Sequence, residues 1–316
     1  MYLLVVAVWM LGAVLSGPYR AHGVEVEVDK IRISYSSQGT SAMPFQIAFE
    51  KGFFREEGLE VQLIQVSPRI AGTAVMNGDL AFTSSFLTTF RGIIQGLPLK
   101  VILIALKRGI YFLAVRSEIK DVQDLKGKKI AVATVKGTDQ LVGEELLRSK
   151  GFDPALVQFV AVGEAGLRAQ ALTAGAVDAT VVSSPHYMYL ERAGFRLLAG
   201  PPEVGFPAAG LITSTRLLQE NPQMAKRTLR AILKAHRFIF ENRQETLQIM
   251  TRLRQPPDIA AQSYEQELLT LSKDGEMTDP EMERLIERIA DKKRPLSEVR
   301  DFSLVRQARN ELDGGK

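Results

Sequence analysis

Short apolar runs alternate with amphipathic stretches of ten or more residues from Ile31 onwards. This alternation predicts βαβ units built on a mostly parallel sheet. The first unit has predicted strands at residues 31–35, 59–66 and 80–83. A helix between the last two of these is expected to begin after Ser67 and to end near Gly78. Serine is a favoured residue at a helix N-terminus, and glycine readily adopts the conformation that ends a helix.

The same order of elements occurs a second time along the chain. Predicted strands lie at residues 129–133, 157–162 and 179–182, with a helix at residues 139–149. In each unit two serines come directly after the third strand, Ser84-Ser85 in the first and Ser183-Ser184 in the second. Two similar lobes are the simplest explanation. Open α/β sheets bind ligands at the carboxyl ends of their strands, so these polar loops are expected to meet in one cleft.

Two segments are expected to connect the lobes. Predicted strands at 101–106 and 111–115 are joined by a short turn that suits a crossover, and residues 206–213 suit the return. From Leu217 onwards the apolar residues recur mostly at intervals of three and four, which predicts helices that pack on the first lobe. The expected organisation is a first lobe of residues 24–106 plus 210–316 and a second lobe of residues 107–209.

An almost wholly apolar run occupies residues 1–16 and is followed by Ala21-His22-Gly23. This arrangement is typical of a cleavable export signal, and we expect residues 1–23 to be removed near Gly23. An uncleaved membrane anchor is the competing interpretation, but the run is shorter than the ~20 apolar residues that a membrane span needs. The mature protein is therefore expected in the periplasm.

Charge and cysteine content narrow the possible functions. The chain has 40 Lys and Arg and 36 Asp and Glu, interleaved along the sequence, which argues against a nucleic-acid partner. There is no cysteine, so disulfides, thiolate metal sites and a cysteine nucleophile are excluded. No paired carboxylates, nucleophile elbow or glycine-rich phosphate loop stands out. We therefore expect a binding protein and not an enzyme, with no metal and no cofactor.

Candidate ligand-binding residues are the polar side chains of the loops that follow the predicted strands. They are Ser36, Ser37, Gln38, Thr40, Arg69, Thr83, Ser84, Ser85, Lys136, Thr138, Ser183, Ser184, His186 and Tyr187. Hydroxyls together with free N–H groups at helix N-termini can hold an anionic group. The alternative for each hydroxyl is a helix cap or a turn. Arg69 and Lys136 are alternatively solvated, and His186 and Tyr187 are alternatively a buried pair. Asp139 and His236 are expected to be structural.

Several local strings occur together in a familiar order. They are residues 49–54 (FEKGFF), 57–61 (EGLEV), 124–132 (DLKGKKIAV), 174–179 (AGAVDA) and 301–303 (DFS). The chain thereby resembles the type II periplasmic binding proteins, within them the branch for nitrate, taurine and alkanesulfonate, and thiamine-precursor uptake. The strings are scaffold motifs and say little about the solute.

The resemblance implies an α/β, two-lobed periplasmic-binding-protein type II clamp, each lobe a mostly parallel sheet flanked by helices. It also implies a monomeric solute-binding subunit of an ABC-type importer, with a permease and its ATPase as partners. Where this family often has acids, the chain has Ala81 and Ser184. This favours an anionic or neutral solute that is sulfonate-, carboxylate-, nitrate- or pyrimidine-like.

Two other functions are compatible with the same fold. One is an enzyme of thiamine-pyrimidine or menaquinone-precursor synthesis, although the pyrimidine-forming family uses a cysteine-rich motif that this chain lacks. The other is a ligand-sensing module that reports to a separate receptor.

Overall fold

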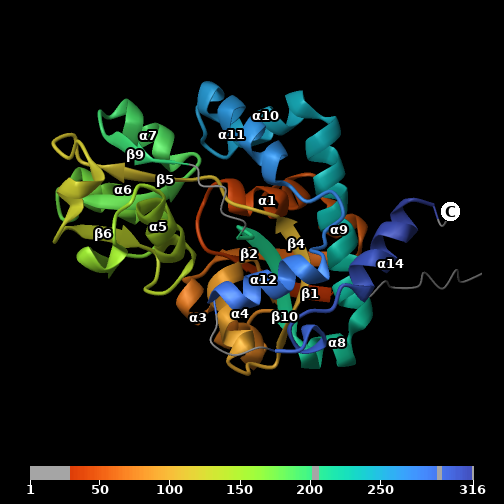
Figure 1. The fold of residues 1–316 in the computed structure, drawn as a ribbon. Helices are drawn as coiled ribbons and strands as arrows, with labels where there is room; N and C mark the ends of the chain where they lie inside the picture. The colour runs from red at the N-terminus through yellow and green to blue at the C-terminus, as the bar shows by residue number, and fades with distance from the viewer. Residues whose placement is uncertain (1–28, 201–205, 290–293, 315–316) are drawn as a thin grey trace, which may run out of the picture.

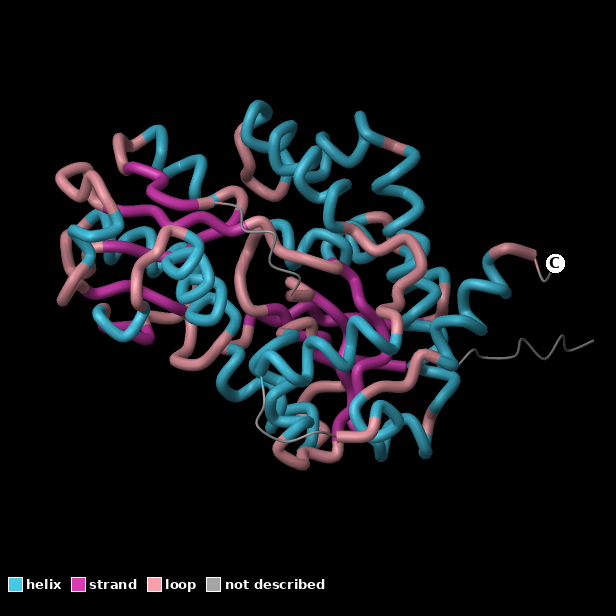
Figure 2. The backbone as a smooth tube through the Cα atoms, in the orientation of Figure 1, coloured by secondary structure: helices cyan, strands magenta, loops and turns pink. Residues whose placement is uncertain are grey.

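The structure is a computed structural model that describes residues 29–200, 206–289 and 294–314. The predicted export signal lies outside the described residues. The described chain forms two lobes, each built on its own five-stranded sheet with helices packed around it (Figure 1). Figure 2 shows the strands of the two sheets as separate groups. The expected two-lobed α/β fold is therefore confirmed.

The sheet of the first lobe has the strand order β2-β1-β3-β10-β4. Its strands are β1 (Asp29–Tyr35), β2 (Leu59–Gln65), β3 (Phe82–Thr83), β4 (Leu99–Leu106) and β10 (Ala209–Ser214). Strand β1 runs parallel to β2 and β3, whereas β10 runs antiparallel to both β3 and β4. Four of the five strands therefore point the same way.

The sheet of the second lobe has the order β7-β6-β8-β5-β9. Its strands are β5 (Tyr111–Val115), β6 (Lys129–Val132), β7 (Gln158–Ala161), β8 (Ala179–Ser183) and β9 (Arg196–Ala199). Here β5 is the antiparallel strand. In each sheet the reversed strand is the one that has just crossed from the other lobe, β5 after β4 and β10 after β9. The two sheets thus repeat one arrangement, as the sequence predicts.

Helices connect the strands and cover the sheets. Those between β1 and β4 are η1 (Thr40–Ala42), α1 (Met43–Glu50), α2 (Phe53–Glu56), α3 (Pro68–Asn77) and α4 (Phe86–Ile94). Those of the second lobe are η2 (Val122–Leu125), α5 (Thr138–Ser149), η3 (Pro154–Leu156), α6 (Ala165–Thr173) and α7 (His186–Arg192). Helix α3 has the predicted ends. Ser67 accepts the N–H of Arg69 at 3.4 Å, and Gly78 has φ 88°.

The chain after β10 is helical. It comprises α8 (Thr215–Glu220), α9 (Pro222–Glu241), α10 (Arg243–Arg252), α11 (Pro257–Thr270), α12 (Asp279–Ile289), α13 (Leu296–Val299) and α14 (Ser303–Leu312). Helix α9 packs on α1 and α2 of the first lobe and on α14. Helix α11 also reaches the second lobe, where Ile259 is fully buried in an apolar cluster with Tyr187 and Met188.

Some elements differ from the sequence predictions. Strand β3 has two residues and not four, and the expected return segment contains the strand β10 from Ala209 onwards. Helix α4 and strand β9 were not predicted. Strand β9 is short, with only Ala199 buried among its four residues, so its apolar pattern is weak.

The two lobes touch next to the crossovers. The N–H of Thr40 donates to the carbonyl oxygen of Ser184 at 3.4 Å. Gly39 precedes it with φ 138°, and a Cβ at this position would lie 2.7 Å from the same carbonyl oxygen. A side chain here would therefore push the lobes apart, which explains glycine at this position.

Candidate functional site

A cavity of about 60 Å³ lies between the lobes at the carboxyl ends of β1, β3, β6 and β8. Both lobes and the returning crossover contribute to its wall. The lining residues are Ser36, Ser37, Ser41, Pro68, Ser85, Phe86, Leu87, Thr88, Tyr111, Ala133, Thr134, Thr138, Asp139, Glu164, Ala165, Arg168, Ser183 and Ala208. Hydroxyl groups are the most frequent polar groups in this set. We refer to it as the interlobe cavity.

Five of the candidate residues from the sequence line the interlobe cavity. They are Ser36, Ser37, Ser85, Thr138 and Ser183. Thr40 lines a smaller adjoining hollow, which it shares with Ser183. The structure thus brings together candidates from four strand-end loops, two in each lobe.

Three candidates are exposed and lie outside this cavity. Gln38 donates to the hydroxyl of Tyr35 at 2.8 Å. Arg69 is exposed in the first turn of α3, as the alternative interpretation proposes. Lys136 is also exposed and lines a different cavity, between α4, α5 and the end of α12.

Thr83 and Ser84 are buried at the end of β3, outside the cavity wall. The Thr83 hydroxyl accepts the hydroxyl of Ser34 at 2.8 Å and the N–H of Ser85 at 3.2 Å. The N–H of Ser84 donates to the carbonyl of Ser34 at 2.7 Å. Both residues therefore tie β3 to β1.

Three further candidates lie beyond the end of β8. The hydroxyls of Ser184 and Ser263 of α11 are 2.5 Å apart. The hydroxyl of Tyr187 accepts a hydrogen bond from Gln266 of the same helix. His186 lies nearby, and burial lowers its pKa to about 4. Ser184 and Tyr187 therefore connect the second lobe to α11.

Two helices point uncapped N-termini at the interlobe cavity, α4 from the first lobe and α5 from the second. Ser85 occupies the N-cap position of α4 but makes no capping bond, and its buried hydroxyl has no hydrogen-bond partner among the residues that the structure describes. Gly137, the N-cap of α5, has no side chain to cap with. The first N–H groups of a helix carry partial positive charge. The cavity therefore offers donors from both lobes to a hydrogen-bond acceptor.

A buried ion pair lies in the wall of the second lobe. The guanidinium of Arg168 lies 3.1 Å from the Asp139 carboxylate. It also donates to the carbonyls of Gly163 at 2.7 Å and Val181 at 3.2 Å, while its Nε has no hydrogen-bond partner in the described part of the chain. The Asp139 carboxylate also accepts the N–H of Ala133 at 3.0 Å. Arg168 was not among the residues predicted to line the cavity, because no sequence pattern in α6 indicates that its first turn faces the cavity.

The other acid of the cavity is also neutralised locally. Glu164 caps α6, and its two carboxylate oxygens accept the N–H groups of Gly166 and Leu167 at 2.8 and 2.9 Å.

Burial, with a smaller contribution from Asp139, raises the pKa of Tyr111 well above its ordinary value. The phenol of Tyr111 is thus a neutral hydroxyl at physiological pH. What the cavity presents to a ligand is mainly hydroxyl and amide groups.

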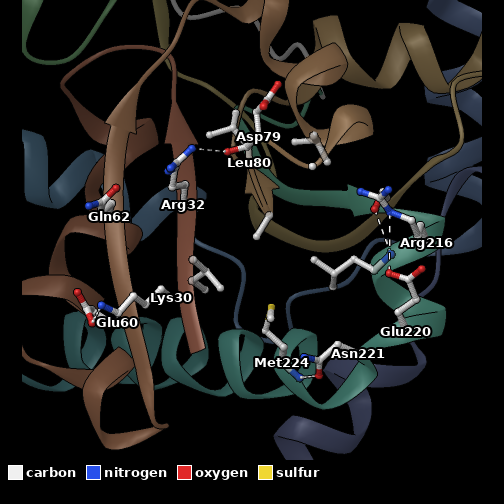
Figure 3. Close-up of a pocket in the computed structure, with 16 residues that line it drawn as sticks. Lys30, Arg32, Glu60, Gln62, Asp79, Leu80, Arg216, Glu220, Asn221 and Met224 are labelled. Atoms are coloured by element: carbon white, nitrogen blue, oxygen red, sulfur yellow. Dashed lines mark hydrogen bonds and ion pairs between the residues drawn. The ribbon is translucent and has the colours of Figure 1, made fainter. Parts of the chain in front are cut away.

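A larger hollow of about 710 Å³ lies at the opposite end of the first sheet (Figure 3). Each of its three cations already has a partner. Lys30 lies 3.5 Å from Glu60, and Arg216 lies 4.0 Å from Glu220. Arg32 donates to the carbonyl of Asp79 at 3.3 Å. Because this hollow is also remote from the carboxyl ends of the parallel strands, we place the candidate site in the interlobe cavity.

Within residues 29–200, 206–289 and 294–314, no three His, Asp or Glu side chains gather in a way that could hold a metal ion. In the same ranges no helix is both long and apolar enough to cross a membrane.

Comparisons with known proteins identify the family and the fold. A model of the family described as NMT1/THI5 like matches residues 40–246, more than half of the chain. A search of curated proteins found no match. Three solved structures are each 16 to 18% identical to the chain. At this identity their likeness shows the fold alone.

The first of these is the ligand-binding component of an ABC-type import system from Staphylococcus aureus with zinc bound. It has a TM-score of 0.72 and covers 89% of this chain and 99% of its own. The periplasmic nitrate-binding protein NrtA from Synechocystis PCC 6803 has a TM-score of 0.73, with 91% and 90% covered. The alkanesulfonate-binding protein SsuA from Xanthomonas axonopodis pv. citri, bound to MOPS, has a TM-score of 0.68, with 89% and 98% covered.

Proposed function

Because the chain belongs to the NMT1/THI5-like family, we propose that it is the extracytoplasmic solute-binding subunit of an ABC-type importer. Proteins of its fold include the binding component of an import system and a periplasmic nitrate-binding protein. Its partners would be a permease and the ATPase that drives it, and it would act in the periplasm after removal of residues 1–23.

The cargo we propose is a small anionic or neutral organic solute that accepts hydrogen bonds. The observation that carries this proposal is the pair of uncapped helices, α4 and α5, that face one cavity from opposite lobes. The charged side chains of the wall are compensated within the protein, Arg168 by Asp139 and Glu164 by the start of α6. Sulfonate, carboxylate, nitrate and pyrimidine groups all present suitable acceptors.

Capture is proposed to occur by hinge closure. The two crossovers, near residues 107–110 and before Ala209, divide the chain into a first lobe of residues 24–106 plus 210–316 and a second lobe of residues 107–209. Rotation about these crossovers would bring Ser36, Ser37 and Ser85 toward Thr138 and Ser183 and exclude water from the solute. The closed form would then present both lobes to the permease.

A thermal-shift screen of the purified protein tests this function. The compounds are nitrate, taurine, alkane and aromatic sulfonates, carboxylates and pyrimidines. A solute that binds only the folded protein stabilises it by about 2.7 kcal/mol at one hundred times its dissociation constant. We expect a clear shift with one of these classes, and the solute recovered unchanged by NMR. Conversion of the solute would favour an enzyme instead, and no shift with any class would contradict the proposed cargo.

A further inference from the structure

A second cavity of about 720 Å³ lies beside the interlobe cavity, where α4, α5 and the end of α12 meet. Its lining residues are Arg91, Ile94, Gln95, Lys136, Gln140, Leu141, Glu144, Glu287, Arg288, Ile289 and Arg294. Four of these side chains are cationic and two are acidic. We refer to it as the cationic chamber.

Two of the four cations have no acidic partner among the described residues. Arg288 pairs with Glu145, and Arg294 lies 2.8 Å from Glu298. Among the described residues Arg91 forms no such pair, and its buried Nη1 has no hydrogen-bond partner there. Burial lowers the pKa of Arg91, and the charge of Glu144 offsets this only in part. A buried cationic nitrogen without a partner is unfavourable, and a bound anion would remove that cost.

Glu144 is already engaged with other groups. Its carboxylate lies 3.1 Å from Arg148 and accepts the side-chain amide of Gln140 at 2.8 Å. It is therefore poorly placed to satisfy Arg91 as well.

Lys136 has an unusual backbone conformation. Its φ is 60°, in the left-handed region that residues with a side chain rarely adopt. Its N–H donates to Oε1 of Gln140 at 2.7 Å, which holds this conformation, while its ammonium has no partner among the described residues. Backbone strain of this kind is concentrated at functional sites. A glycine would be less strained here, so the lysine side chain is the feature that needs an explanation.

The two unpartnered cations come from opposite lobes. Arg91 belongs to α4 of the first lobe, and Lys136 belongs to the loop before α5 of the second. Closure of the lobes brings these like charges into one chamber, which is unfavourable unless an anion lies between them. An anion held there would favour the closed form.

We propose that Arg91 and Lys136 bind an oxyanion group, a carboxylate, sulfonate or phosphate, between the two lobes. The chamber adjoins the interlobe cavity. Arg91 follows Thr88 by one helical turn, and Lys136 precedes Thr138 by two residues, while the hydroxyls of Thr88 and Thr134 are 3.5 Å apart. The oxyanion is therefore either the second acidic group of an extended solute or a separate inorganic anion.

Calorimetric titration with inorganic sulfate and phosphate, at constant ionic strength, tests the site without knowledge of the solute. The variants are Arg91→Gln and Lys136→Gln, and the control is Lys150→Gln, which removes an exposed charge at the far end of α5. Each chamber variant removes a charged hydrogen bond to the anion, so its affinity for sulfate or phosphate should fall about tenfold. The control should leave it unchanged.

A series of alkane-α,ω-disulfonates of increasing length, each compared with its monosulfonate, distinguishes the two sources. Tighter binding of one disulfonate, lost in Arg91→Gln and Lys136→Gln, indicates a second group of one solute. Tight binding of inorganic sulfate or phosphate, with no disulfonate bound more tightly than its monosulfonate, indicates a separate anion.

The proposal is overturned if no oxyanion binds the wild-type protein, or if binding is unchanged in both chamber variants. If Ser183→Ala weakens binding of a solute while both chamber variants bind disulfonates and inorganic anions as the wild type does, the importer function stands and the chamber alone is rejected.

Discussion

The carboxylate of Asp139 lies 3.1 Å from the guanidinium of Arg168, and both side chains are almost fully buried in the second lobe. Arg168 also donates to the carbonyls of Gly163 and Val181. One side chain thereby joins the start of α6, the strand β8 and the first turn of α5. All three elements contribute to the wall of the interlobe cavity.

Replacement of Asp139 by asparagine should destabilise the protein. The change leaves the Arg168 charge buried without its counter-ion, and removing one partner of a buried pair costs about 3–5 kcal/mol. Urea denaturation measures the change in the free energy of unfolding. The control is Lys30→Met in the exposed pair with Glu60, where we expect a loss of at most about 1 kcal/mol. Equal, small losses in both variants would show that the Asp139 pair is not structural.

Helix α11 should hold the second lobe close to the first. Ile259 of this helix is fully buried in the apolar cluster of the second lobe. Ile259→Ala removes apolar contacts there, so the open form should become more populated and the radius of gyration measured by small-angle scattering should increase. The matched control is Leu269→Ala in the same helix, where the side chain is 65% exposed. An unchanged radius of gyration in Ile259→Ala would argue against this role.

His236 should make the protein less stable in acid. Burial lowers its pKa from 6.5 to about 4, so between these values the unfolded chain takes up a proton that the folded protein does not. Stability therefore falls as the pH decreases from 6.5 to 4, by up to about 1.4 kcal/mol per pH unit for one histidine. His236→Asn keeps a donor for the carbonyl of Ser272 and should reduce this slope in melts across that range. Identical pH profiles would contradict the assignment.

Glu267 should have the opposite dependence. Its buried carboxyl group has no hydrogen-bond partner within the described ranges, and burial raises its pKa well above 4.5. Above pH 4.5 the unfolded chain releases a proton that the folded protein retains, so this residue lowers stability as the pH rises. Glu267→Gln should therefore increase the melting temperature more at pH 8 than at pH 5. Glu265→Gln, at an exposed position of the same helix, should not show this difference.

Much of the fold could be predicted from the sequence. Apolar strands, helix-capping serines and terminal glycines are local features, and they placed β1, β5 and α3 correctly to within a residue or two. Strand β9 lacked such a signal, because its four residues are mostly half-buried or exposed and show no clear alternation of apolar and polar positions. The repeated Ser-Ser pair correctly indicated that the third strand of each unit ends at the cleft.

The site could be predicted only in part, because side-chain direction depends on the fold. Ser85 and Ser183 line the interlobe cavity, whereas their neighbours Ser84 and Ser184 are buried elsewhere. Both members of each pair look alike in the sequence. The role of Arg168 depends on contacts with three separate elements, which no local pattern encodes.

Capture of a solute between the lobes is tested most directly with two matched variants, Ser85→Ala in the first lobe and Ser183→Ala in the second. Calorimetric titration would use the solute that gives the largest thermal shift, with Ser149→Ala, exposed at the far end of α5, as the control. Loss of one hydrogen bond should weaken binding by about three- to tenfold in each cavity variant and not in the control. A solute that binds both cavity variants with wild-type affinity would show that it is held elsewhere and would contradict the account.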